Sequence, residues 1–165
     1  MTANSLEDLF VEGLQEMYYT EQQLVDALQE LEEGSTEEEI KNAFSEHREE
    51  TQGHVDRLEE VFEAIGHDAE AHEDPIVDAM IHQHEEFVNG DPDEKMLERY
   101  NLMSGQKSEH YEIASYGNLI PLAQQLGHDD VADTLEETLR EEQEALDEVS
   151  TLSEEFDYGD IESPQ

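Results

Sequence analysis

The chain of 165 residues contains no cysteine, and this excludes disulfides, thiolate catalysis and cysteine-ligated zinc sites. No apolar run approaches the length that a membrane-spanning helix needs. The first residues, MTANSLEDLF, lack the basic and apolar regions of a secretory signal. A glycine-rich phosphate loop and a Gly-x-Ser-x-Gly motif are also missing, so nucleotide and acyl-transfer chemistry have no support. We therefore expect a soluble, cytoplasmic protein that does not bind membranes.

Positive charge is scarce as well. The chain has 7 Lys+Arg against 47 Asp+Glu, which gives a formal net charge of −40. Nucleic-acid binding is disfavoured because a basic surface is missing. So large a charge repels itself in dilute buffer, but molar salt screens it because the Debye length falls to about 3 Å. We interpret the composition as that of a protein from a salt-accumulating, haloarchaeal-type cytoplasm. The alternative is a mimic of DNA, and the even spread of acidic residues over all helices argues against it.

Apolar residues recur with a helical period through most of the chain, which argues against disorder despite a hydrophobic content of only 35%. The predicted helices cover residues 4–33, 36–65, 75–88, 93–126 and 129–155. Two long helices, a connection with a short helix and two more long helices is the order of a ferritin-like bundle. We predict an all-α, ferritin-like four-helix bundle with a long crossover that carries a short extra helix. Residues 1–156 should form a single domain, and residues 157–165 a flexible acidic tail.

Local signals define where these helices begin and end. Gly34 is expected to end the first helix, and Ser35 or Thr36 to cap the second, with Glu39 in place for a capping box. Pro75 suits the first turn of the short helix.

Each long predicted helix carries a glutamate in the middle of its apolar stripe: Glu21, Glu50, Glu109 and Glu142. An unpaired, ionised carboxylate in a bundle core is costly or becomes protonated, so it needs a compensating group. A shared polyvalent cation would compensate all four. Two simpler readings stay open: a solvated position at the edge of the stripe for any one of them, or a metal-free core in which water or shared protons satisfy them.

Two further residues extend this set. His54 lies four residues after Glu50, and Glu112 lies three after Glu109, so each shares a helix face with its partner. Mixed carboxylate and imidazole ligands suit iron or manganese, with zinc possible, and bridging carboxylates hold two ions about 3.5–4 Å apart. The predicted ligands of two divalent metal ions are Glu21, Glu50, His54, Glu109, Glu112 and Glu142.

Other polar and aromatic side chains near this set receive a structural interpretation. His47 shares a face with His54, but it is interpreted as a hydrogen-bonded core residue rather than a ligand. Four tyrosines flank the predicted site, and packing is preferred for them over a role beside the metals: Tyr18, Tyr19, Tyr111 and Tyr116.

Four segments within residues 4–150 carry a family resemblance: LEDLFVEGLQEMYYTEQQLVDAL, HREETQGHVDRLEEVF, KSEHYEIASYGNLIPLAQQLG and LEETLREEQEALDEVS. In these segments the chain resembles the family of the bacterial YciE and YciF stress proteins. The resemblance implies a ferritin-like bundle, often a homodimer, with a dinuclear metal centre and a link to stress responses.

The chain departs from the better-understood ferritin-like enzymes in one respect. Those proteins take a Glu-x-x-His pair from each of two helices, whereas Ala145 stands three residues after Glu142. Glu112 is expected to replace the missing histidine, giving five carboxylates and one imidazole. This composition permits two metals but puts oxygen or peroxide activation in doubt.

Two functions fit these residues. One is metal oxidation or peroxide detoxification at a di-metal centre, with a small oxidant or a metal ion as substrate. The other is a non-enzymatic metal-binding or structural bundle, in which the metal contributes only to folding and dimer stability. Whether the chain is an enzyme stays open at this point.

Overall fold

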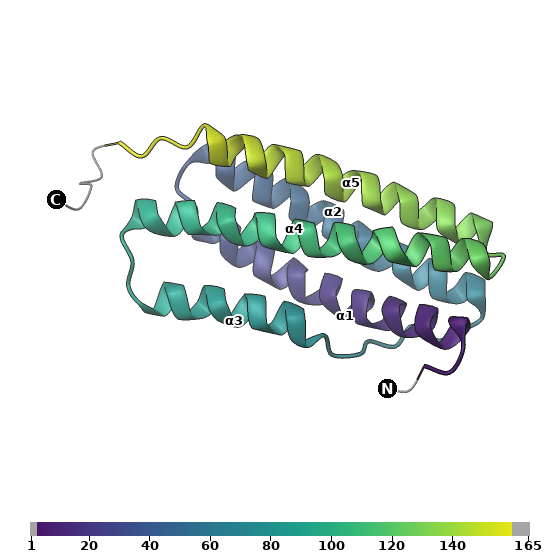
Figure 1. The fold of residues 1–165 in the computed structure, drawn as a ribbon. Helices are drawn as coiled ribbons and strands as arrows, with labels where there is room; N and C mark the ends of the chain where they lie inside the picture. Colours follow the sequence, from purple (N-terminus) through teal and green to yellow (C-terminus); the bar gives the residue numbers. More distant parts are fainter. Residues whose placement is uncertain (1–2, 160–165) are drawn as a thin grey trace.

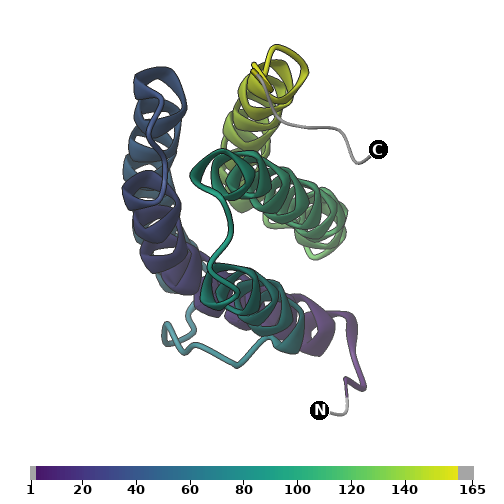
Figure 2. The ribbon, with the colours of Figure 1, turned by 90° about the vertical axis from the view of Figure 1, so that its left-hand side faces the viewer.

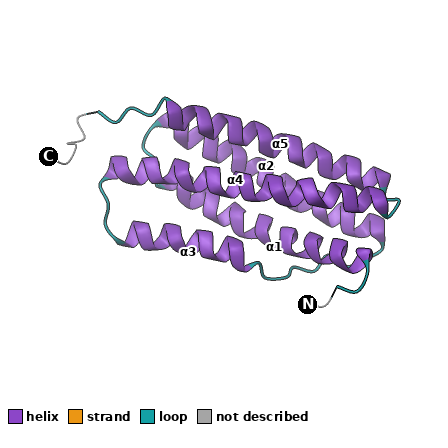
Figure 3. Ribbon diagram, viewed as in Figure 1, coloured by secondary structure: helices purple, strands orange, loops and turns teal. Residues whose placement is uncertain are grey.

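The computed structural model describes residues 3–159 and contains five helices in this range. They are α1 (Leu6–Glu33), α2 (Glu38–Ile65), α3 (Pro75–Asn89), α4 (Glu94–Gln125) and α5 (Asp129–Glu154). No strand occurs in the described part of the chain (Figure 3). The prediction of an all-helical, ferritin-like bundle is confirmed. The single-domain assignment of residues 1–156 stays a prediction.

The four long helices form two hairpins that pack against each other (Figure 1). Packing is most extensive within the hairpins, between α1 and α2 and between α4 and α5. The hairpins meet through α1 with α4 and through α2 with α5. The crossover from α2 to α4 carries α3, which lies outside the bundle against α4 and α1 (Figure 2). This connectivity surrounds one central axis with four long helices, so mid-helix residues from all four can meet.

The buried residues of each long helix follow alternating steps of three and four residues, the pattern of an inward-facing stripe. They form two apolar clusters. One contains Phe10, Leu14, Phe62 and Leu135, and the other contains Leu28, Phe44, Leu102 and Val149. Because the two clusters use opposite halves of α1, a buried layer at the middle of the bundle separates them, and this layer is polar.

The start of α2 differs from the sequence prediction. Its N-cap residue, Glu37, makes no side-chain capping bond, and the Ser35 hydroxyl donates to the Leu31 carbonyl instead, at 2.7 Å. The buried carboxylate of Glu98, from α4, accepts from the amides of Thr36 at 2.8 Å and Glu37 at 2.6 Å. A carboxylate from another helix therefore caps α2, and a local capping pattern cannot reveal such a partner.

Two further expectations concern the ends of the chain and the membrane. Phe156 is buried, and the Arg99 guanidinium donates to the Tyr158 hydroxyl at 3.1 Å, so the beginning of the predicted tail contacts the bundle. Residues 160–165 of that tail lie outside the described residues. Among the described helices, none has the length and apolar character required to cross a membrane.

Candidate metal centre

Six acidic and imidazole side chains fill the polar layer between the apolar clusters. Each is at most 5% exposed. They are Glu21 from α1, His47 and His54 from α2, Glu109 and Glu112 from α4, and Glu142 from α5. Every long helix therefore contributes at least one potential ligand at the same depth in the bundle.

The six residues form two groups of potential metal ligands that share Glu142. His47, Glu109 and Glu112 make the first group with Glu142, and Glu21 and His54 make the second. Within each group the donor atoms lie within 4.8 Å of one another. A carboxylate that belongs to both groups is the feature expected of a bridge between two ions.

Both imidazoles face Glu142 with one ring nitrogen. His54 Nδ1 lies 2.8 Å from Glu142 Oε1, and His47 Nε2 lies 3.7 Å from Glu142 Oε2. The two oxygens of Glu142 thus face different histidines. His47 Nε2 also lies 2.5 Å from Glu109 Oε1, and His54 Nδ1 lies 3.5 Å from Glu21 Oε1.

Short distances in this layer do not amount to a hydrogen-bonded network. Both carboxylate oxygens of Glu109, Glu112 and Glu142 are buried and have no partner with hydrogen-bond geometry. The same holds for Glu21 Oε2 and His54 Nδ1. Buried polar atoms almost always have partners, because an unpaired one costs about 1–3 kcal/mol. Donor atoms that converge without bonding one another suit a ligand set for cations.

The charge of the layer agrees with this interpretation. The four carboxylates, Glu21, Glu109, Glu112 and Glu142, carry four negative charges when ionised. Two divalent cations would balance them and leave both imidazoles neutral, which is the form that binds metals. The residues present therefore fit a pair of divalent ions.

Without cations, protons supply the compensating charge. Burial raises the pKa of Glu109 to about 8, although His47 opposes this shift. Burial and the charges of Glu142 and Glu21 hold the pKa of Glu112 well above its usual value. Burial lowers the pKa of His54, but the carboxylates of Glu142 and Glu21 outweigh this effect and raise it to about 11.

His47 and Glu142 follow the same electrostatic logic. Burial lowers the pKa of His47, but the charge of Glu109 outweighs this effect and raises the pKa well above its ordinary value. Burial raises the pKa of Glu142, but His54 and Glu109 outweigh this effect and lower it to about 2. Glu142 is thus the ionised partner of two cationic imidazoles in the metal-free protein.

A polar chain outside the layer fixes the ring of His54. His54 Nε2 lies 2.8 Å from Glu141 Oε2, and the Arg57 guanidinium donates to both Glu141 oxygens, at 2.7 and 2.8 Å. Arg57 also donates to the Thr138 hydroxyl at 3.2 Å. A carboxylate on the outer nitrogen orients a histidine and holds its proton there, leaving the inner nitrogen for a metal.

The surroundings of His47 are different. Its outer nitrogen, Nδ1, lies 3.6 Å from Glu50 Oε2 and has no hydrogen-bond partner. The Glu50 side chain is 50% exposed and belongs to neither ligand group. The placement of Glu50 on the buried stripe is therefore wrong, and His47 occupies the position in the layer.

Of the four tyrosines near the predicted site, Tyr116 contacts a member of the layer. Its buried hydroxyl donates to Glu21 Oε1 at 2.5 Å. Tyr18 donates to Glu59, Tyr19 donates to Asp78, and Tyr111 donates to Asp74. The Tyr18 bond joins α1 to α2, and the Tyr19 and Tyr111 bonds tie α1 and α4 to the start of α3.

The structure thus brings together five of the six predicted ligands: Glu21, His54, Glu109, Glu112 and Glu142. It replaces Glu50 by His47, so the expected set of five carboxylates and one imidazole becomes four carboxylates and two imidazoles. Sequence reasoning also missed Glu141 and Arg57. The available signal was Arg57, which lies three residues after His54 and so shares its helix face. A basic residue at that place stands out because the chain has only 7 Lys+Arg.

The fold is that of the ferritin-like bundles, and four carboxylates with two imidazoles is the ligand composition of the dinuclear carboxylate members of that class. In that class each of two helices supplies one histidine, whereas here α2 supplies both, seven residues apart. The fold and the composition of the layer are those of the class, and the distribution over the helices is particular to this chain.

The chain belongs to the family described as a domain of unknown function, DUF892, whose model matches residues 5–157. It is 34% identical over 143 residues to the protein YciF of Escherichia coli K12, covering 86% of each chain. The structure of that stress protein superposes with a TM-score of 0.87 at 32% identity, covering 92% of this chain and 96% of the other.

YcfI of Rhodopseudomonas palustris, provisionally described as a structural protein, has a TM-score of 0.87 at 36% identity. The match covers 90% of this chain and 94% of that one. A protein of Xanthomonas campestris shares the fold at 21% identity, with a TM-score of 0.75 over 91% of this chain and 92% of the other.

Proposed function

We propose that this chain is a dinuclear metal-binding protein of the stress-protein type, which holds two divalent ions in the polar layer of the bundle. The observation that carries the proposal is Glu142, whose two buried oxygens have no hydrogen-bond partner and face two different histidines. One ion would be held by His47, Glu109, Glu112 and Glu142, and the other by Glu21, His54 and Glu142.

Iron and manganese suit this ligand set best, because carboxylates and imidazoles together match both metals. Either metal would supply the ability to exchange electrons with oxygen species or peroxide, and zinc would not. The chain itself positions the ligands: Glu141 and Arg57 fix the His54 ring, and Tyr116 donates to Glu21. The apolar clusters on both sides keep bulk water away from the layer.

Metal analysis of the purified protein tests the binding proposal. We expect about two iron or manganese ions per chain, and a loss of both after Glu142→Gln. Peroxide-consumption and ferrous-oxidation assays on the same samples then test for turnover. Metal-free protein that takes up no iron or manganese on reconstitution would overturn the proposal.

A non-enzymatic role is the second candidate, and the burial of the layer favours it. The six side chains are 0–5% exposed, so a substrate larger than a small oxidant has little access. In this role metal binding contributes free energy to folding. Metal-dependent melting without turnover of peroxide or ferrous iron would select this function.

We also propose that the protein works in the concentrated salt of a haloarchaeal-type cytoplasm and forms a homodimer. The net charge of −40 supports the first proposal, since salt screens its self-repulsion. A melting temperature that fails to rise between about 0.1 and 2 M KCl would contradict it. Sedimentation in concentrated KCl tests the dimer.

A further inference from the structure

His47 is the member of the polar layer that lies nearest to solvent. It is 5% exposed, whereas the other five side chains are at most 1% exposed. Its Nε2 faces Glu109 and Glu142, and its unpartnered Nδ1 points outward to Glu50, 3.6 Å away. The ring of His47 therefore stands between the buried layer and an exposed carboxylate.

A second acidic side chain lies at the same place on α5. Helices α2 and α5 run antiparallel, since Arg57 bonds to Thr138 and His54 to Glu141. Each step back along α2 therefore corresponds to an equal step forward along α5. His47 lies seven residues before His54, and Glu148 lies seven residues after Glu141, so this register sets Glu148 opposite His47. Glu148 is exposed at its surface position.

The electrostatics of Glu148 agree with this register, in which α2 and α5 present acidic side chains to the same spot. Partial burial and the charges of Glu46 and Glu50 raise the pKa of Glu148. Carboxylates close enough to repel one another are also close enough to attract a divalent cation together.

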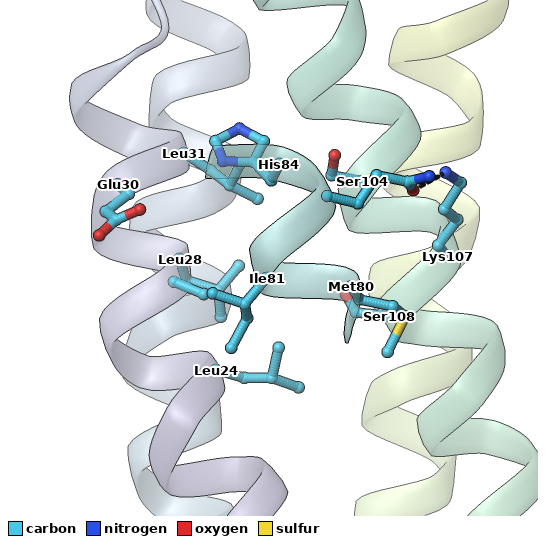
Figure 4. Close-up of a pocket in the computed structure, with 12 residues that line it drawn as sticks. Leu24, Leu28, Glu30, Leu31, Met80, Ile81, His84, Ser104, Lys107 and Ser108 are labelled. Carbon is cyan, nitrogen blue, oxygen red and sulfur yellow. Dashed lines mark hydrogen bonds between the residues drawn. The ribbon is translucent and has the colours of Figure 1, made fainter. Parts of the chain in front are cut away.

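The other flanks of the layer are less suited to a cation. Arg57 and its bond to Glu141 cover the His54 side with a positive charge. The pocket beneath α3 has aliphatic walls that include Leu24 and Ile81, and Lys107 lies on its α4 side (Figure 4). Neither flank offers an exposed carboxylate next to an unpartnered buried nitrogen.

We propose that Glu50 and Glu148 form an entry site, at which a hydrated divalent cation is captured before it passes His47 into the buried centre. This inference rests on the proposed metal-binding function and assigns Glu50 a role outside the ligand set. An exposed pair of carboxylates binds weakly enough to release the ion inward. A local concentration of negative charge raises association rates by about 10- to 1000-fold.

Stopped-flow uptake of aqueous cobalt(II) by metal-free protein tests the entry site, because the visible absorption of cobalt reports its ligands. The test variant is Glu50→Gln/Glu148→Gln, measured at fixed ionic strength. The matched control is Glu60→Gln/Asp133→Asn, which removes the same charge from exposed positions at the other end of α2 and α5. Circular dichroism verifies the fold of both variants.

We expect the test variant to load about tenfold more slowly than wild type, with an unchanged final stoichiometry and spectrum. The control variant should load within about twofold of wild type, since its charges lie far from His47. Equal loading rates for the test and control variants would overturn the entry site and leave the metal centre standing. A wild type that binds no cobalt at equilibrium would instead overturn the proposed function.

Discussion

The two histidines of the polar layer occupy matching positions on one helix but have unequal surroundings. His54 is held by Glu141, which Arg57 binds through two hydrogen bonds, and it is fully buried. His47 has no partner for its outer nitrogen and faces the half-exposed Glu50. One half of the layer is thus fixed from outside, and the other borders an exposed carboxylate through a nearly buried histidine. For the proposed metal centre, we therefore expect one rigid metal position and one exchangeable position.

Removing the shared carboxylate should have the largest effect, because Glu142 serves both halves. Glu142→Gln leaves His54 and His47 without their common negative partner. We expect the metal-free protein to lose about 3–5 kcal/mol of stability, the cost of breaking a buried charge pair, and to lose both metal positions. Denaturant unfolding and metal titration measure the two effects. Glu112→Gln serves as the control for the unfolding measurement, since the raised pKa of Glu112 favours its neutral form, and its stability should change less.

The two halves should also differ in how steeply their metal affinity depends on pH. The His47 half contains three groups with raised pKa values, namely His47, Glu109 and Glu112. In the His54 half, the raised pKa belongs to His54, at about 11. Ligands must lose these protons to bind metal, so affinity rises with pH, by about tenfold per pH unit for each displaced proton.

Variants that each keep only one half of the layer measure the pH dependence of metal affinity separately for the two halves. His54→Ala retains the His47 half, and His47→Ala retains the His54 half. Calorimetry between about pH 6 and 8, in buffers of different ionisation enthalpy, counts the released protons. We expect more protons from the His47 half, and equal counts would contradict the assignment of the raised pKa values.

Substitutions of the outer carboxylates compare the rigid and the open half directly. Glu141→Gln should weaken one metal position by about 10- to 100-fold, the usual effect of losing the partner that orients a ligating histidine. Glu50→Gln should change equilibrium affinity by less than about fivefold, because exposed ion pairs contribute little. Competition titrations with a chelator measure both. Equal losses for the two variants would remove the distinction between the halves.

The smallest expected effect concerns Tyr116, whose hydroxyl donates to Glu21 in the His54 half. Tyr116→Phe should lower the stability of the metal-free protein by about 1.5–3 kcal/mol, the range for a hydrogen bond to a charged group. Tyr18→Phe is the matched control, because Tyr18 donates to Glu59 outside the layer. Metal binding should be altered by the first substitution and unaffected by the second.

The fold was predictable because burial in a long-helix bundle follows a strict local period. On α1 the buried residues Leu14, Met17, Glu21 and Leu24 keep to alternating steps of three and four, and this placed Glu21 correctly. The short helix of the crossover followed from Pro75, which stands in its first turn.

The error at Glu50 came from the phase of the same period on α2. Phe44, His47, Thr51 and His54 are the buried residues, with steps of three, four and three. Choosing Glu50 in place of Thr51 puts two steps of three in succession, and the one-residue shift turns the side chain by about 100° out of the core. A strict alternation of three- and four-residue steps after His47 selects Thr51 rather than Glu50. Glu50 then leaves the buried stripe, and His47 remains on it as a potential ligand.

Contacts between helices were beyond a single sequence. Glu98 caps α2 at amides that lie 61 and 62 residues earlier in the sequence. Arg57 bonds to Glu141, which lies 84 residues later. Such partners depend on how the hairpins are aligned, which the period of one helix does not specify.

Anomalous scattering from crystals loaded with iron or manganese tests the central claim most directly. We expect two peaks about 3.5–4 Å apart, one among His47, Glu109 and Glu112 and one between Glu21 and His54, with Glu142 touching both. The absence of any peak in this layer, at a metal concentration that saturates the protein in solution, would contradict a dinuclear centre.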